Sequence, residues 1–104
     1  MSKYNIEITK SAENDLLEIG KYISNELLEP DRALKVVDKI ATTIFKLEEM
    51  PTRHPIVSDD KLASKGIRKF IIDNHIVFYI VNEKNKLVTI IRILYKRRVW
   101  VNIL

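Results

Sequence analysis

The first residues of the chain alternate between apolar and polar side chains. This period of two over residues 3–9 predicts a short strand with one buried face. The apolar positions are Tyr4, Ile6 and Ile8. Thr9 or Ser11 is a suitable cap for a helix that follows, because a hydroxyl oxygen accepts a hydrogen bond from a free N–H of the first turn.

Apolar residues then recur every three or four positions in two successive segments. The periodicity predicts amphipathic helices over about residues 11–28 and 31–49. The first helix has Ala12, Leu16, Ile19, Ile23 and Leu27 on its apolar face, and the second has Ala33, Val37, Ile40, Ile44 and Leu47. Pro30 separates the helices, and so short a connection predicts an antiparallel hairpin. Gly20 has no side chain and permits close packing within the first helix.

The pattern changes after residue 50. Residues 51–65 contain two prolines and no periodicity, and are predicted to form a loop. Three segments rich in Ile, Val, Phe and Tyr follow at 67–72, 75–81 and 87–95, with turn-forming residues between them. They predict a three-stranded antiparallel meander. The fold class is therefore α+β, a single domain over 1–104 of order β-α-α-β-β-β, with the helical hairpin on one face of an antiparallel sheet.

The last predicted strand is apolar on both faces. Strict alternation places Leu87, Thr89, Ile91, Ile93 and Tyr95 on one face and Val88, Ile90, Arg92 and Leu94 on the other. One face is expected to pack against the helices. The other must be covered by the tail, residues 96–104, or by a partner.

Composition narrows the possible classes of protein. The 104 residues contain no cysteine, which excludes a disulfide scaffold and a thiolate zinc site. Only two glycines are present, so no glycine-rich phosphate loop is expected, and we predict no metal or other cofactor. The sequence shows no signal-peptide pattern and no apolar stretch of membrane-spanning length, which predicts a cytoplasmic location and no membrane partner.

The charges are distributed unevenly. Residues 1–60 contain 8 Lys and Arg against 12 Asp and Glu, a net charge of −4. Residues 61–104 contain 10 Lys and Arg against 2 Asp and Glu, a net charge of +8. So basic a half indicates a polyanionic partner, either nucleic acid or an acidic protein.

Several basic residues are candidates for a binding surface. Arg92 interrupts an apolar strand, so it must pair with a helix acid such as Asp15 or Glu18, or face a partner. Arg68 is open to the same two interpretations. The run Lys96, Arg97 and Arg98 is followed by Trp100, which can stack on a base or cap the core. The histidines, His54 and His75, fit loop or turn positions, and Tyr79 fits a core position.

Four segments and their order resemble a known family. They are MPTRHP at 50–55, GIRKF at 66–70, VFY at 77–79 and IIRILYKRR at 90–98. With the order of elements, they resemble the RelE/ParE superfamily of bacterial toxins from type II toxin–antitoxin systems over essentially the whole chain. The resemblance implies a small cytosolic toxin held inactive by an acidic, partly disordered antitoxin.

The superfamily has two activities, and one position favours the ParE-like subgroup. ParE-like members poison DNA gyrase and have no bond-breaking chemistry of their own, whereas RelE-like members cut mRNA on the ribosome. The RelE-like pattern places an arginine just after the aromatic residue that opens the second meander strand, where this chain has Ile76. Lys69 matches one RelE-like basic position, but Ile67 occupies its neighbour. The resemblance therefore favours an inhibitor of gyrase bound to DNA.

The expected target-binding residues are the basic ones of the sheet and tail with the nearby tryptophan: Arg68, Lys69, Arg92, Lys96, Arg97, Arg98 and Trp100. The alternative is a ribosome-dependent mRNA endoribonuclease. RNA cleavage by a 2′-hydroxyl needs proton-transfer groups and cations that stabilise the phosphorane. Arg68, Lys69, Arg97 and Arg98 are the candidate cations, and Tyr95 or His75 the candidate proton-transfer group. An inactive or regulatory relative is the third possibility.

Overall fold

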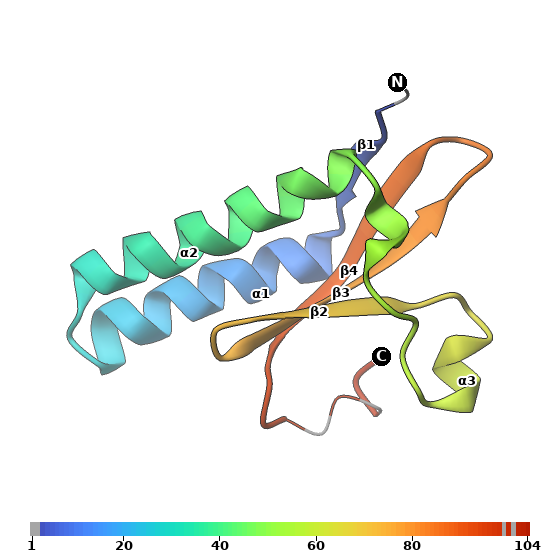
Figure 1. Ribbon diagram of the computed structural model, residues 1–104. Coiled ribbons are helices and arrows are strands. Elements are labelled where there is room, and N and C mark those ends of the chain that lie inside the picture. The colour runs from blue at the N-terminus through green and yellow to red at the C-terminus, as the bar shows by residue number, and fades with distance from the viewer. Residues whose placement is uncertain (1–2, 99, 101) are drawn as a thin grey trace.

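The protein consists of a helical hairpin packed on one face of a four-stranded sheet (Figure 1). The structure is a computed structural model that describes residues 3–98, 100 and 102–104. The four strands are β1 (Asn5–Ile8), β2 (Arg68–Ile72), β3 (His75–Asn82) and β4 (Leu87–Tyr95). The α+β class and the order β-α-α-β-β-β are confirmed.

The two long helices follow β1 directly. Helix α1 (Lys10–Lys21) continues into a π-helical turn, Tyr22–Glu26, and α2 (Pro30–Phe45) continues into a 3₁₀ turn, Lys46–Glu48. Thr9 caps α1, because its hydroxyl oxygen accepts a hydrogen bond from the Ala12 N–H at 3.2 Å.

The helices approach closely at Gly20. A Cβ atom at this glycine would lie 3.3 Å from Cγ2 of Val37. The expectation of close packing at Gly20 is thus confirmed.

The sheet is mixed, with strand order β1-β4-β3-β2. Strands β2, β3 and β4 form the predicted antiparallel meander, whereas β1 pairs parallel with β4. The prediction of a wholly antiparallel sheet is corrected at this one edge. A parallel pair needs a long crossover connection, which the helical hairpin and the other strands provide.

A β-bulge breaks the alternation of β4. Phe78 pairs with Arg92 and Tyr79 pairs with Ile90, which leaves Ile91 without a partner on β3. Because one extra residue shifts the period of two, Ile90 and Ile93 both lie under the helices. The predicted assignment of alternating faces along β4 was therefore wrong beyond Ile90.

The sheet separates two apolar clusters. The first lies under the helices and includes Ile40, Ile44, Tyr79, Val88 and Ile90. The second covers the opposite face and is formed by Ile76, Phe78 and Leu94 with the tail residues Trp100, Ile103 and Leu104 packed against it. The chain end returns to this side of the sheet (Figure 1). The second apolar face is thus covered by the tail, one of the two expected solutions.

The segment predicted as a loop contains two short helices, which corrects that prediction. They are a 3₁₀ turn, Pro51–Arg53, and α3, Asp60–Ala63. Asp59 caps α3 by accepting a hydrogen bond from the Leu62 N–H at 3.0 Å, and Leu62 packs in the second cluster. A single helical turn is too short to produce a recognisable period in the sequence.

Candidate functional site

The basic tail leaves the sheet from the end of β4. Lys96, Arg97 and Arg98 are all exposed, and none of the ion pairs within the described residues involves them. The start of the run is fixed by the Lys96 N–H, which donates to the Asn74 carbonyl at 2.9 Å. The tail therefore presents three cations from an anchored backbone.

Trp100 and Lys69 lie together on the tail side of the sheet. The Trp100 ring packs against Phe78 with 5.0 Å between ring centroids. The Lys69 ammonium lies 5.2 Å from the centre of the Trp100 ring, a cation–π contact. Trp100 therefore caps the second cluster and also holds a lysine at its surface.

Arg68 holds the backbone of the neighbouring loop. Its guanidinium donates to the carbonyls of Thr52 and His54, at 3.3 and 2.7 Å. The buried Tyr79 hydroxyl donates to the Pro51 carbonyl of the same loop at 2.7 Å. Desolvation raises the pKa of Tyr79 to about 12, so its phenol stays protonated at neutral pH.

Arg92 is paired with the helix acid Asp15. Its Nε and Nη2 atoms donate to the two carboxylate oxygens at 2.7 and 2.8 Å. The Ile93 N–H donates to the same carboxylate at 2.9 Å. The hydrogen bond that Arg92 donates to Asp15 is the main cause of its raised pKa. Because β1 ends before this part of β4, Asp15 occupies the free strand edge. Arg92 thus joins α1 to β4.

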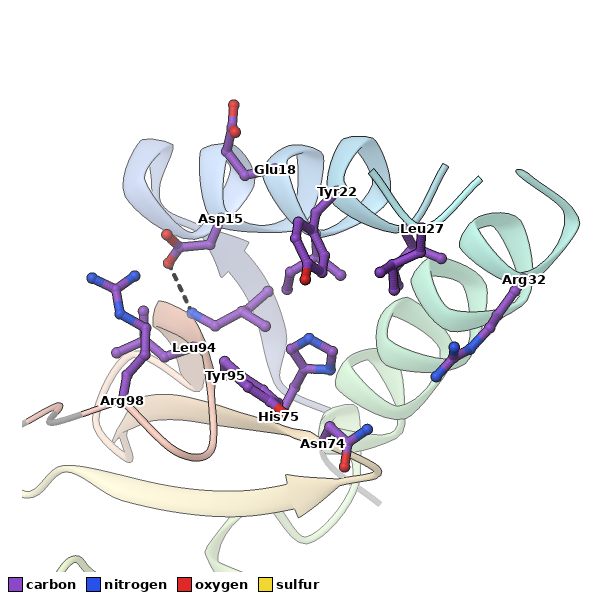
Figure 2. Close-up of a pocket in the computed structure, with 13 residues that line it drawn as sticks. Asp15, Glu18, Tyr22, Leu27, Arg32, Asn74, His75, Leu94, Tyr95 and Arg98 are labelled. Atoms are coloured by element: carbon purple, nitrogen blue, oxygen red, sulfur yellow. Dashed lines mark hydrogen bonds between the residues drawn. The ribbon is translucent and has the colours of Figure 1, made fainter. Parts of the chain in front are cut away.

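A cavity of about 640 Å³ opens between the helices and the part of the sheet where β3 begins and β4 ends (Figure 2). Its lining is mostly apolar and aromatic, and includes Ile19, Tyr22, Leu27, His75, Ile93 and Tyr95. Arg98 of the basic tail also lines it. Sequence reasoning singled out His75, Tyr95 and Arg98 but missed Tyr22, whose only signal is a large aromatic side chain off the apolar stripe of its helix.

His75 is the most unusual group in the cavity wall. Its ring lies 5.9 Å from that of Tyr95. Its Nδ1 atom is buried and has no hydrogen-bond partner among the described residues. Burial lowers the pKa of His75, with Asp73 acting in the opposite direction, so the imidazole is neutral at pH 7.

The candidate residues from the sequence fall into three separate places. Lys69 and Trp100 lie on the tail side of the sheet, whereas His75, Tyr95 and Arg98 line the cavity beside the helices. Arg68 contacts the 51–55 loop instead. Within residues 3–98, 100 and 102–104, no three His, Asp or Glu side chains are grouped as metal ligands.

None of the helices in the described part of the chain combines the length and apolar character needed to cross a membrane.

Comparison with known proteins agrees with this fold. Residues 6–100 match the family model described as the ParE toxin of the type II toxin–antitoxin system parDE. No functionally curated protein matches the sequence.

Three solved structures share the architecture. A chain of the chromosomal ParDE system of Pseudomonas aeruginosa is 21% identical with a TM-score of 0.74, covering 89% of this chain and 96% of that one. A chain of the RelBE2 complex of Mycobacterium tuberculosis is 17% identical with a TM-score of 0.68, covering 94% of this chain and 97% of that one. A chain of the intact RelBE complex of E. coli is 12% identical with a TM-score of 0.62, covering 91% of this chain and 99% of that one. At these identities the likeness concerns the fold.

Proposed function

The chain belongs to the ParE toxin family of type II toxin–antitoxin systems, and we propose that it inhibits DNA gyrase bound to DNA by binding, without breaking a bond itself. Ile76 is the observation that carries this proposal. It is only 4% exposed and packs with Phe78 and Leu94 in the second cluster. An apolar side chain enclosed in this way cannot stabilise a phosphorane, although the RelE-like pattern puts an arginine there.

We assign target binding to the tail side of the molecule. Lys96, Arg97 and Arg98 are exposed at the start of the tail, and Lys69 lies over Trp100, which follows two residues after Arg98. A surface of this charge complements an enzyme that holds DNA. In this proposal Arg68 and Arg92 act through other groups, because Arg68 positions the 51–55 loop and Arg92 joins β4 to α1.

We propose that a cognate acidic antitoxin binds the toxin and holds it inactive. The solved structures named above are toxin–antitoxin complexes, which supports a partner of this kind. The net charge of +8 over residues 61–104 favours a segment rich in Asp and Glu. An amphipathic helix laid along the hairpin or the sheet, with or without an added strand, is the expected mode of binding.

Ribosome-dependent cleavage of mRNA is the second candidate. It is favoured by the cavity, which brings a neutral imidazole, a phenol and a guanidinium to one place, from His75, Tyr95 and Arg98. These groups include a proton-transfer residue and a cation, two of the roles that 2′-hydroxyl attack requires. The lysine at position 69 lies on the other side of the sheet, which weighs against a complete nuclease site.

Expression in a bacterial host separates these activities. We expect a DNA-damage response and cleaved DNA held by gyrase, with transcripts intact. The matched variant is K96Q/R97Q/R98Q, which should abolish the response, whereas K84Q in the β3–β4 turn removes a cation elsewhere and should retain it. New 5′ ends in translated mRNA with intact DNA would establish the nuclease instead. Neither effect, with normal growth, would indicate an inactive or regulatory relative.

A further inference from the structure

The cavity beside the helices has the character of a ligand site, and among its lining residues only Arg98 belongs to the proposed target-binding surface. Its volume of about 640 Å³ lies within the ~300–1,000 Å³ typical of small-ligand pockets. The walls are mainly apolar, and the neutral polar groups Asn74 and His75 lie at one end. Four charged side chains also line the cavity: Asp15, Glu18, Arg32 and Arg98. Such a site suits a flat, largely apolar group with hydrogen-bonding edges.

Aromatic rings stand at this end of the cavity. Tyr22 is 57% exposed and Tyr95 is 43% exposed, although both are large rings beside an apolar wall. Figure 2 shows Tyr22 reaching from the helix toward the His75 ring, with Tyr95 beside it. Tyr22 is also the first residue of the π-helical turn, a rare irregularity that is found frequently at functional sites.

His75 offers hydrogen-bonding groups to a molecule in the cavity. The Nδ1 atom has no acceptor among the described residues, so a proton on it would leave a buried N–H without a partner. A lone pair on the same atom would equally lack a donor, so both tautomers of the neutral ring leave Nδ1 without a partner in the described residues. The His75 ring nitrogens and the Asn74 side-chain amide are groups that can form hydrogen bonds with the edge of a planar heterocycle.

Positive charge at the β4 side of the cavity favours the binding of an anion there. Tyr95 is followed directly by Lys96, Arg97 and Arg98, and Arg98 itself lines the cavity. The nearby carboxylate of Asp15 is neutralised by its two hydrogen bonds from Arg92.

The other charged groups of the rim lie on the helices. Glu18 belongs to α1, and Arg32 in the first turn of α2 pairs with Glu29 at 2.9 Å. A phosphate chain would therefore run along the tail and away from the acidic helix.

We propose that this cavity receives one unstacked nucleobase of a single-stranded nucleic acid, with Tyr22 and Tyr95 contacting the base and the Lys96–Arg97–Arg98 run holding the adjacent phosphates. Base–aromatic stacking and a neighbouring basic track are the two components by which proteins bind single strands. The proposal is independent of gyrase, because it concerns binding by the isolated chain.

Fluorescence anisotropy with two labelled single-stranded DNA oligonucleotides tests the proposal, one intact and one with all bases removed from its central positions. We expect the intact strand to bind more tightly. Tyr22→Ala should weaken binding of the intact strand about ten-fold and leave the abasic strand unchanged. Tyr22→Phe should restore affinity, since the ring stacks without its hydroxyl. Arg98→Gln should weaken both strands equally and reduce the salt dependence.

One control and two contradicting outcomes complete the experiment. Leu34→Ala removes an apolar side chain, 72% exposed on α2, that does not line the cavity, and it should change nothing. Equal affinity for both strands with no effect of Tyr22→Ala would overturn the proposal. So would displacement of the intact strand by an acidic peptide whose binding depends on Tyr22, because the cavity would then belong to a protein segment.

Discussion

At the scale of single residues, the Asp15 carboxylate makes the most consequential contact. It accepts three hydrogen bonds, from two Arg92 nitrogens and the Ile93 N–H, while its side chain is only 13% exposed. Asp15→Ala would leave a partly buried guanidinium and a strand-edge N–H without partners. We expect the free energy of unfolding in urea to fall by about 3 kcal/mol.

Glu18→Ala is the matched control for this prediction. Glu18 is an exposed acid on the same helix and lies one turn from Asp15. Its removal should change the free energy of unfolding by less than about 0.5 kcal/mol. Equal losses from the two variants would contradict a specific role for the Asp15–Arg92 pair.

Tyr79 gives the protein a pH dependence in the alkaline range. Burial raises its pKa from 10.0 to about 12 in the folded state. The unfolded chain therefore releases this proton first, so the stability contributed by Tyr79 is fully present below pH 10.0 and is lost as the pH rises toward about 12. Urea unfolding of the wild type should show this decline.

The Tyr79→Phe variant should lack this part of the decline. It should also be less stable at pH 7 by about 1 kcal/mol, because the Pro51 carbonyl loses its hydrogen bond from the hydroxyl. Identical pH profiles for the two proteins would show that Tyr79 ionises alike in the folded and unfolded states.

Sequence reasoning reached a definite limit at these residues. The apolar strand around Arg92 required a partner for the guanidinium, and Asp15 and Glu18 were both available. Which acid it would be depends on how far α1 is shifted and rotated over the sheet. Spacing within one segment does not contain that information, and the pairing became definite only with the packed structure.

At the scale of elements, the contact between α1 and α2 depends on Gly20. Its missing Cβ would lie 3.3 Å from Val37, a tight contact. Gly20→Ala gains up to ~1 kcal/mol of helix propensity but compresses this contact, so a near-neutral effect on the free energy of unfolding is expected. Gly20→Leu should cost about 2 kcal/mol by overpacking.

A second substitution tests whether the steric contact is the cause. Val37→Ala, added to Gly20→Leu, makes room at the crossing and should recover part of the lost stability in chemical denaturation. If the double variant is less stable by the sum of the two single effects, the two positions do not interact and the helices cross elsewhere.

Periodicity identified the long elements and failed where one residue or one turn decides the structure. The strands and both helices have enough repeats to be recognised, and their existence and order were predicted. The bulge at Ile91 involves one residue, and α3 is one turn, so neither changes the pattern over a useful length. The parallel pairing of β1 with β4 is set by how the elements stack, which a local pattern does not encode.

At the scale of the whole molecule, the uneven charge gains a structural meaning. The acidic residues of the first half lie mostly on the exposed faces of the helices, and the basic residues lie on the sheet and the tail. From the charge pattern alone we predict a polyanionic partner. The same pattern could not predict the cavity, whose walls come from segments far apart in the sequence.

The charge also determines how the proposed antitoxin complex should respond to salt. An acidic segment that binds residues 61–104, with a net charge of +8, gains from attraction that ions screen over about 10 Å at 0.1 M salt. The dissociation constant, measured by titration calorimetry, should therefore rise several-fold between low and high salt. K96Q/R97Q/R98Q should flatten this dependence, whereas K84Q should not. An affinity that stays constant across the salt series would mean that apolar contacts alone hold the complex, and that the basic half serves the target.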